Sequence, residues 1–160
     1  MNGRFLVAFD TKNGSTAEVA EAIGSRLRER GCAAEVRPTR EVRDVEDIGA
    51  LVVGAPIYSG RWLSGAHRVL KRAAKLPSDR RPLIAVFALG PRINEGPENW
   101  VRPREQFERA LMKDRSIAPI TTALFGGADP PKKKPRRDVR DWEAIRAWAD
   151  EVAGLLAGPS

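Results

Sequence analysis

Cysteine and histidine are almost absent from this chain of 160 residues, which contains one of each, Cys32 and His67. A single cysteine excludes a disulfide within the chain and a metal site built from several cysteines. A single histidine argues against a metal site built from imidazoles. We therefore expect neither a disulfide framework nor a metal centre, and this composition fits a reducing, cytoplasmic environment.

Long hydrophobic runs are also missing. No segment approaches the roughly 18 consecutive apolar residues that a membrane-spanning helix requires. Residues 1–4 lead directly into an apolar segment, so the sequence predicts no signal peptide. The apolar fraction of 42% is ordinary for a globular protein, and the length suits one hydrophobic core. We expect one domain over residues 1–158.

Positive charge is plentiful and unevenly placed, with a net charge of +7. Between residues 130 and 140 there are six basic residues and one acid, Asp138. This segment is either a solvated face or a docking surface for an acidic partner, anionic lipid or a substrate carboxylate. Nucleic acid is not favoured, because the charge lacks interleaved aromatic residues. The basic residues are Lys132, Lys133, Lys134, Arg136, Arg137 and Arg140.

Strand and helix patterns alternate along the whole chain. This alternation predicts a parallel sheet with helices on both faces, in which ligands bind beyond the carboxyl ends of the strands. With strand order 2-1-3-4-5, the loops after Asp10, Ala55 and Leu89 meet at one place. The expected strands are residues 4–10, 33–37, 49–55, 82–89 and 117–125, and the expected helices are 16–30, 63–76, 98–113 and 141–156.

The loop of residues 11–16, Thr-Lys-Asn-Gly-Ser-Thr, lies between the first strand and the first helix. A helix N-terminus leaves backbone N–H groups unpaired and its dipole favours an anion, so this loop predicts a phosphate site. Ser15 and Glu18 fit a capping box, in which Glu18 folds back toward Ser15. The alternative is an ordinary strand-to-helix turn with a good cap.

Three loops together resemble the flavin-binding loops of the flavodoxin family. Residues 11–16 resemble its phosphate loop, residues 55–62 (Ala-Pro-Ile-Tyr-Ser-Gly-Arg-Trp) the loop along the flavin ring, and residues 89–92 (Leu-Gly-Pro-Arg) the start of the third loop. The resemblance implies a flavodoxin-like three-layer α/β sandwich, with a five-stranded parallel sheet of order 2-1-3-4-5 and helices on both faces.

Three segments resemble more specifically the flavodoxin-domain subgroup that includes the menaquinone-dependent protoporphyrinogen oxidases. These are residues 13–20, residues 58–63 and residues 140–149. Oxidases of this subgroup tend to carry an extra segment before the last helix, which is shorter here. The resemblance implies FMN as the cofactor. It gives as binding residues Thr11, Lys12, Asn13, Gly14, Ser15, Thr16, Pro56, Ile57, Tyr58, Ser59, Gly60, Trp62, Leu89, Gly90, Pro91 and Arg92.

Several of these residues carry two interpretations. Tyr58 and Trp62 either cover a flavin face or pack at the start of the next helix. Gly60 either accommodates a backbone change on flavin reduction or is a turn glycine. Arg92 either faces an anion at the ring edge or is an exposed loop residue. His67 is either a proton relay or an ordinary helix residue.

The sequence therefore favours an FMN flavoprotein that transfers electrons. The leading hypothesis is an oxidoreductase of heme biosynthesis resembling the protoporphyrinogen oxidases, with quinone and a tetrapyrrole or other acidic substrate as partners. The alternatives are a simple flavodoxin-type electron carrier and a flavodoxin-fold binding domain that has lost FMN. We expect a cytoplasmic protein. Lys132, Lys133, Lys134, Arg136 and Arg137 are the residues expected to contact an anionic membrane, at its inner face, or an acidic redox partner.

Overall fold

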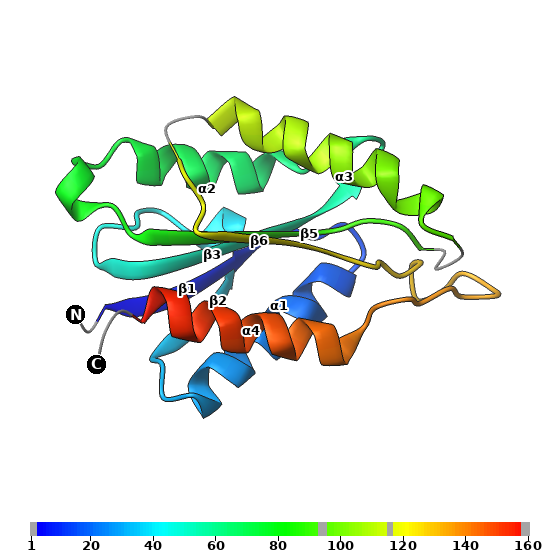
Figure 1. Ribbon diagram of the computed structural model, residues 1–160, viewed down its shortest axis with the longest axis horizontal. Coiled ribbons are helices and arrows are strands. Elements are labelled where there is room, and N and C mark those ends of the chain that lie inside the picture. Colours follow the sequence, from blue (N-terminus) through cyan, green and yellow to red (C-terminus); the bar gives the residue numbers. More distant parts are fainter. Residues whose placement is uncertain (1–2, 93–95, 115–116, 158–160) are drawn as a thin grey trace.

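A parallel sheet lies between two layers of helices in the computed structural model, which describes residues 3–92, 96–114 and 117–157 (Figure 1). Residues 1–2 and 158 of the expected domain, and residues 93–95 of the third loop, lie outside these ranges. The strands are β1 (Arg4–Phe9), β2 (Ala34–Pro38), β3 (Ile48–Tyr58), β4 (Arg61–Trp62), β5 (Leu83–Leu89) and β6 (Thr121–Phe125). The α-helices are α1 (Ser15–Glu29), α2 (Ser64–Ala74), α3 (Glu98–Leu111) and α4 (Trp142–Leu156).

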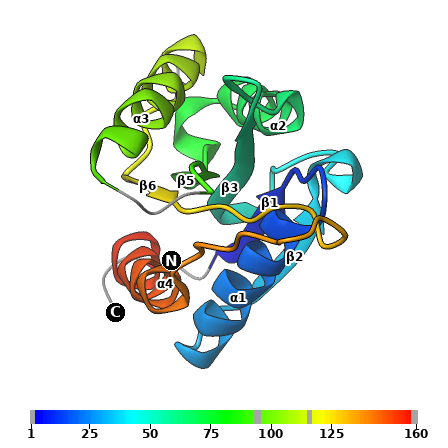
Figure 2. The same cartoon turned by 90° about the vertical axis from the view of Figure 1, so that its right-hand side faces the viewer.

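The strand order is β2-β1-β3-β5-β6, and all of these neighbours are parallel. This confirms the predicted fold class and the predicted order 2-1-3-4-5, once the short β4 is set aside. The sequence did not predict β4, which pairs antiparallel with the end of β3. Parallel strands place all their carboxyl ends at one edge, which is the right-hand end of the sheet in Figure 1 and faces the viewer in Figure 2.

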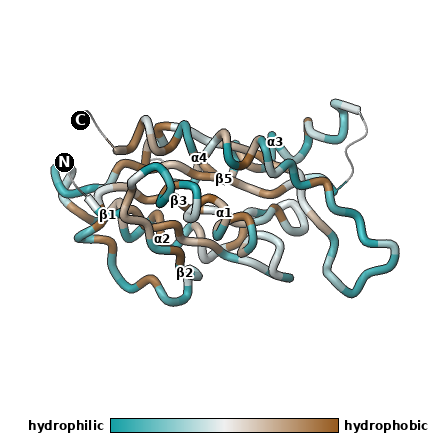
Figure 3. The backbone as a smooth tube through the Cα atoms, turned by 90° about the horizontal axis from the view of Figure 1, so that it is seen from below, coloured by the Kyte–Doolittle hydropathy of each residue, from teal (hydrophilic) through white to brown (hydrophobic). Residues whose placement is uncertain are grey.

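Two hydrophobic cores cover the two faces of the sheet. On one face α1 and α4 pack with the apolar positions that the helical spacing predicts, including Val19, Ile23 and Leu27. On the other face α2 and α3 pack, with Val69 and Phe107 among the buried residues. The central strands are hydrophobic along their length, as Figure 3 shows, because they are buried on both sides.

Two strand boundaries differ from the prediction by more than one residue. Strand β3 continues to Tyr58 instead of ending at Ala55, because Ile57 and Tyr58 pair with β4 and Pro56 lies in register with Leu89. The last strand begins at Thr121 instead of residue 117. Pro119 precedes it and has no N–H to donate to a ladder.

Helix α1 begins at a different cap from the predicted one. Its N-cap is Gly14, in the left-handed conformation with φ of 95°, and no side chain caps the helix. The capping box of Ser15 and Glu18 was therefore wrong. The predicted stop at Gly31 is confirmed: the N–H groups of Gly31 and Cys32 bond the carbonyls of Arg28 and Leu27, as in a Schellman motif.

Pro103 lies inside helix α3, which continues past it to Leu111. Helix α4 begins as expected, with Asp141 as its N-cap and the Ala144 N–H donating to its side chain at 3.0 Å. Among the described residues, no helix is long and apolar enough to cross a membrane.

Candidate functional site

The loop of residues 11–16 forms a tight turn beneath the N-terminus of α1. The Gly14 N–H donates to Thr11 Oγ1 at 2.9 Å, so the first hydroxyl of the loop is used to hold the turn. An added Cβ at Gly14 would meet no atom within 4 Å, so the space above this backbone is open. Its positive φ is one that only glycine adopts without strain. The loop therefore presents uncovered backbone to the outside at the helix start.

Thr16 has a buried hydroxyl without a hydrogen-bond partner. The residue is 0% exposed, and its Oγ1 has no partner among the described residues. A buried hydroxyl of this kind costs free energy unless an acceptor or donor reaches it. Because Thr16 lies in the first turn of α1, a phosphate oxygen at the helix start would satisfy both the hydroxyl and the free N–H groups. The loop thus has the features of a phosphate site.

Glu18, an acidic residue in the first turn of α1, is held in an ion pair. Its Oε1 lies 2.7 Å from Arg140 Nη1, which also donates to the Ser15 carbonyl at 3.2 Å. Asp138 holds the same guanidinium through Nε and Nη2. This arrangement keeps the Glu18 carboxylate occupied, so its charge is compensated next to the expected phosphate position.

The second loop is a hairpin turn between β3 and β4. Ser59 and Gly60 both have positive φ, 51° and 78°, which is the pattern of a type I′ turn. Tyr58 precedes the turn and is half-buried, and Lys12 Nζ lies 5.1 Å from the centre of its ring. A cation over an aromatic face is attractive, so this contact joins the first loop to the second.

An open cavity of about 520 Å³ lies between the second and third loops. The loops expected to bind a flavin ring border it together with two positions of α3 and one from the segment after β6. Residues of the second and third loops therefore lie side by side around it, and no residue of the loop 11–16 is among its lining. The lining residues are Ile57, Tyr58, Ser59, Gly90, Pro91, Arg92, Asn99, Pro103 and Arg137.

Three of the other predicted residues lie elsewhere. Pro56 and Leu89 pair in the sheet, and Leu89 is buried in the core on the α1 side. Trp62 is 2% exposed, and its Nε1 donates to the Ala55 carbonyl at 3.1 Å. Of the two interpretations of Trp62, the geometry favours packing, because the indole is enclosed against the rings of His67 and Phe107. Tyr58 keeps an accessible ring.

Asp129 is a fully buried carboxylate at the base of the segment after β6. Arg137 donates to it three times, from its backbone N–H, Nε and Nη2, at 3.0, 2.8 and 3.2 Å. Arg92 Nη1 lies 3.5 Å from Oδ1 and Lys133 Nζ lies 3.7 Å from it. Hydrogen bonds from Arg137 hold the pKa of this carboxyl far below its usual range. The two arginines at the rim of the cavity are thus fixed by one buried charge.

The basic residues of the same segment are mostly paired. Arg136 contacts the Asp138 carboxylate and donates to the Asp129 carbonyl. The two that form no ion pair within the described ranges are Lys132 and Lys134, and both are exposed. This segment is the hydrophilic loop that extends furthest in Figure 3, from the same edge as the cavity. The free charge of the loop is smaller than its sequence suggests.

Asp129 was missed in the sequence because it is one acid just before a basic run. The signal that was available is its position, directly after Gly126, Gly127 and Ala128 at the end of a strand. Asn99 and Pro103, which line the cavity from α3, were also missed, because nothing local places a helix beside a loop that lies earlier in the chain.

The chain is similar in sequence to known proteins. Residues 6–129 match a family model described as a flavodoxin domain. The protoporphyrinogen IX dehydrogenase [quinone] of Escherichia coli strain K12 is 24% identical over 184 aligned positions. That alignment covers 97% of this chain and 97% of the Escherichia coli protein.

Solved structures share the fold at lower identity. Oxidised flavodoxin 1 from Bacillus cereus has a TM-score of 0.65 and 16% identity, with 96% of this chain and 99% of that one covered. Rubredoxin oxygen:oxidoreductase from Desulfovibrio gigas has a TM-score of 0.65 and 17% identity. The match covers 96% of this chain but only 36% of that longer protein.

Proposed function

The chain belongs to the flavodoxin domain family, and on that premise we propose that it binds FMN at the carboxyl edge of its sheet and transfers electrons. We further propose an oxidoreductase similar to the quinone-linked protoporphyrinogen IX dehydrogenase, acting on a tetrapyrrole or another acidic substrate. We take residues 1–158 as one domain that carries this function. When bound, FMN supplies reversible electron transfer, and the chain supplies binding, orientation and charge.

The observation that carries the proposal is the Thr16 hydroxyl. It is buried, it has no partner among the described residues, and it lies at a helix start whose backbone N–H groups are open. These features suit a phosphate, since both the hydroxyl and the helix dipole favour an anion with several acceptor oxygens. Lys12 adds a positive charge close by.

The ring of the cofactor is assigned to the 520 Å³ cavity. Tyr58 offers an accessible aromatic face from one side, and Gly90 and Pro91 offer backbone from the other. Arg92 and Arg137 stand at the rim, where their charge would favour a reduced, anionic flavin or a substrate carboxylate. This is the role that the sequence suggested for Arg92, extended to Arg137.

Two measurements test the proposal. Titration of the purified protein with FMN should quench flavin fluorescence with one-to-one stoichiometry. Absence of quenching would refute FMN binding and favour the alternative of a flavodoxin-fold binding domain that has lost FMN. Oxidation of protoporphyrinogen IX with menaquinone as acceptor then separates the oxidoreductase from a simple electron carrier, which would bind FMN without this turnover.

The loop after β6 supports a contact with an anionic surface, through Lys132 and Lys134. Vesicles that contain anionic lipid should bind the protein in a salt-dependent way, because these side chains are exposed and unpaired within the described ranges. The double variant Lys132→Gln with Lys134→Gln should remove this binding. Unchanged vesicle binding would refute the contact and leave the FMN proposal intact.

A further inference from the structure

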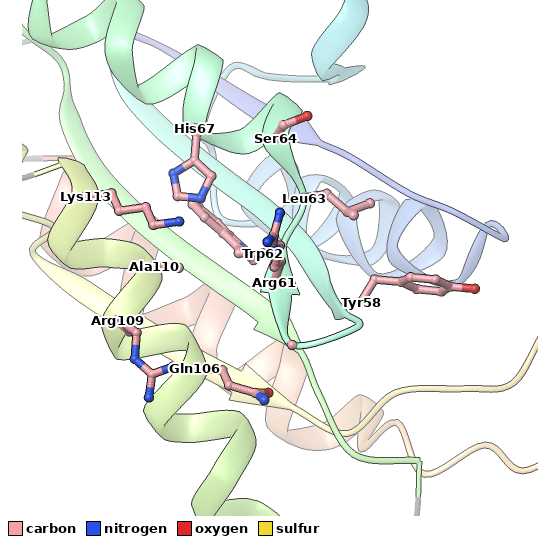
Figure 4. Close-up of a pocket in the computed structure, with 11 residues that line it drawn as sticks. Tyr58, Arg61, Trp62, Leu63, Ser64, His67, Gln106, Arg109, Ala110 and Lys113 are labelled. Carbon is pink, nitrogen blue, oxygen red and sulfur yellow. The ribbon is translucent and has the colours of Figure 1, made fainter.

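A second cavity, of about 390 Å³, lies between α2 and α3 and is closed at one end by the hairpin of β3 and β4 (Figure 4). It is separate from the cavity assigned to the flavin ring, although Tyr58 borders both. Its volume is in the range of cavities that hold small organic molecules. Neither the ring nor the phosphate of the proposed cofactor is assigned to it.

Three basic side chains line this cavity. Arg61 comes from β4, Arg109 from α3 and Lys113 from the 3-10 turn Met112–Asp114, and none of the described lining residues is acidic. None of the three forms an ion pair within the part of the chain that the structure describes. Like charges gathered around a hollow repel each other, and an anion inside the hollow relieves that repulsion.

His67 is held in a fixed orientation at the edge of the same cavity. Its Nδ1 lies 2.8 Å from Asp114 Oδ2, and the Asp114 side chain is only 3% exposed. With Nδ1 engaged, Nε2 is the ring nitrogen left for a ligand. It accepts a hydrogen bond when the ring is neutral and donates one when the ring is protonated. An imidazole fixed by a buried carboxylate is therefore one polar contact of the site.

The floor of the cavity is aromatic and apolar. Trp62 lies edge-on to His67, with 5.2 Å between ring centres and 86° between planes. Leu63 and Ala110 complete the apolar lining. Figure 4 shows Trp62 below His67, and Lys113 extending from the turn after α3 toward the same space. A flat ring fits such a floor, while its charged group meets the cations at the rim.

We propose that this cavity is a binding site for a small aromatic carboxylate. The ring packs against the apolar lining that Leu63 and Ala110 provide, and the carboxylate is held by Arg109 and Lys113. Arg61 closes the site from the hairpin side. Gln106, whose amide nitrogen would lie 3.2 Å from a Cβ at Gly60, lies beside the hairpin turn. The site is thus built from α2, from α3 with the turn that follows it, and from the β3–β4 hairpin, which is the one part it shares with the flavin loops.

The test uses 2-naphthoate as the probe, with calorimetric titration of the FMN-saturated protein. We expect one-to-one binding, and at least about tenfold weaker binding of the uncharged 2-naphthamide, which keeps the ring and loses the charge. Equal binding of the two compounds would overturn the proposal. So would competition between 2-naphthoate and FMN, which would place the probe in the flavin cavity.

A matched pair of variants locates the site. Arg109→Gln with Lys113→Gln should weaken 2-naphthoate binding about tenfold or more. Arg102→Gln with Arg104→Gln removes the same charge from other exposed positions of α3 and should leave binding within about twofold. Equal losses in both variants would show a general charge effect and overturn the proposal. Thermal melts of both variants exclude unfolding as the cause.

Discussion

Glu18 and Arg140 lie 122 residues apart in sequence, and their side chains form an ion pair of 2.7 Å between Oε1 and Nη1. The Arg140 side chain is only 5% exposed, and its guanidinium lies 4.8 Å from the centre of the Trp142 ring. It also bonds Asp138 and the Ser15 carbonyl. One arginine therefore fastens the end of the basic loop to the first turn of α1, beside the expected phosphate position.

Replacement of Arg140 by lysine should loosen the basic loop. A lysine keeps the charge but offers no planar fork of donors for Asp138, Glu18 and the Ser15 carbonyl together. Limited digestion with trypsin should cut within residues 132–137 about threefold or more faster than in the wild type. Arg146→Lys, on an exposed position of α4, is the control and should digest at the wild-type rate.

Replacement of Thr16 by valine should lower the affinity for FMN without lowering the stability of the fold. The hydroxyl has no partner to lose among the described residues, so urea unfolding should be unchanged or slightly shifted to higher urea. FMN affinity should fall about tenfold to hundredfold, because a hydrogen bond to a charged phosphate is removed. Thr122→Val, on the exposed side of β6, should change neither. An unchanged FMN affinity in Thr16→Val would refute the phosphate assignment.

Much of the fold followed from sequence because its signals are periodic. Val19, Ile23 and Leu27 recur at helical spacing, and the apolar strands alternate with such helices, so a parallel sheet with helices on both faces could be inferred. The order of its strands was implied by the resemblance of three loops to those of the flavodoxin family. The start of α1 could not be inferred. Ser15 and Glu18 match the local pattern of a capping box, but Glu18 forms an ion pair with Arg140, which is distant in sequence. Tertiary contacts of this kind leave no trace in a local pattern.

Replacement of Asp129 by asparagine should lower stability at neutral pH. Its pKa is depressed in the folded protein, chiefly by hydrogen bonds from Arg137, so the ionised form stabilises the fold above the usual carboxyl pKa of about 3.9. That contribution is lost as the pH falls toward the folded pKa. The gap in urea midpoint between the wild type and Asp129→Asn should therefore be largest near neutrality and shrink below about pH 4.

Asp47→Asn provides the comparison for this pH series, since Asp47 is exposed. Its midpoint should follow the wild type at every pH. A gap between the wild type and Asp129→Asn that stays constant into acid would contradict the assignment of a charged Asp129. The same variant should also make the Lys132–Arg137 segment more accessible to trypsin, because Arg137 loses its partner.

Replacement of Trp62 by phenylalanine decides between its two interpretations. The Ala55 carbonyl loses its indole donor, so the free energy of unfolding should fall by about 1–3 kcal/mol. FMN affinity should stay within about twofold, because the ring is enclosed. Tyr58→Leu should do the reverse, lowering FMN affinity with little effect on unfolding. A loss of FMN affinity in Trp62→Phe as large as in Tyr58→Leu would favour the flavin-covering role.

The sequence predicts those parts of the candidate site that consist of consecutive residues. It does not predict the parts that form only when distant elements pack together. The loop of residues 11–16 and the turn at Ser59 and Gly60 were readable as motifs. The burial of Trp62 and the 390 Å³ cavity depend on where α2 and α3 come to lie, which single-residue patterns do not encode. Asp129 belongs to the same class, since its partners lie 8 and 37 residues away.

The long loop after β6 is closed at its base by backbone contacts. Ala128 bridges Asp138, the Asp129 N–H donates to the Arg137 carbonyl at 2.7 Å, and the Val139 N–H donates to the Gly127 carbonyl at 3.0 Å. The two ends of this loop, residues 127–129 and 137–139, therefore lie side by side independently of the residues between them. We therefore expect changes of length between these two ends to alter the surface that the protein presents there while the sheet and α4 keep their places.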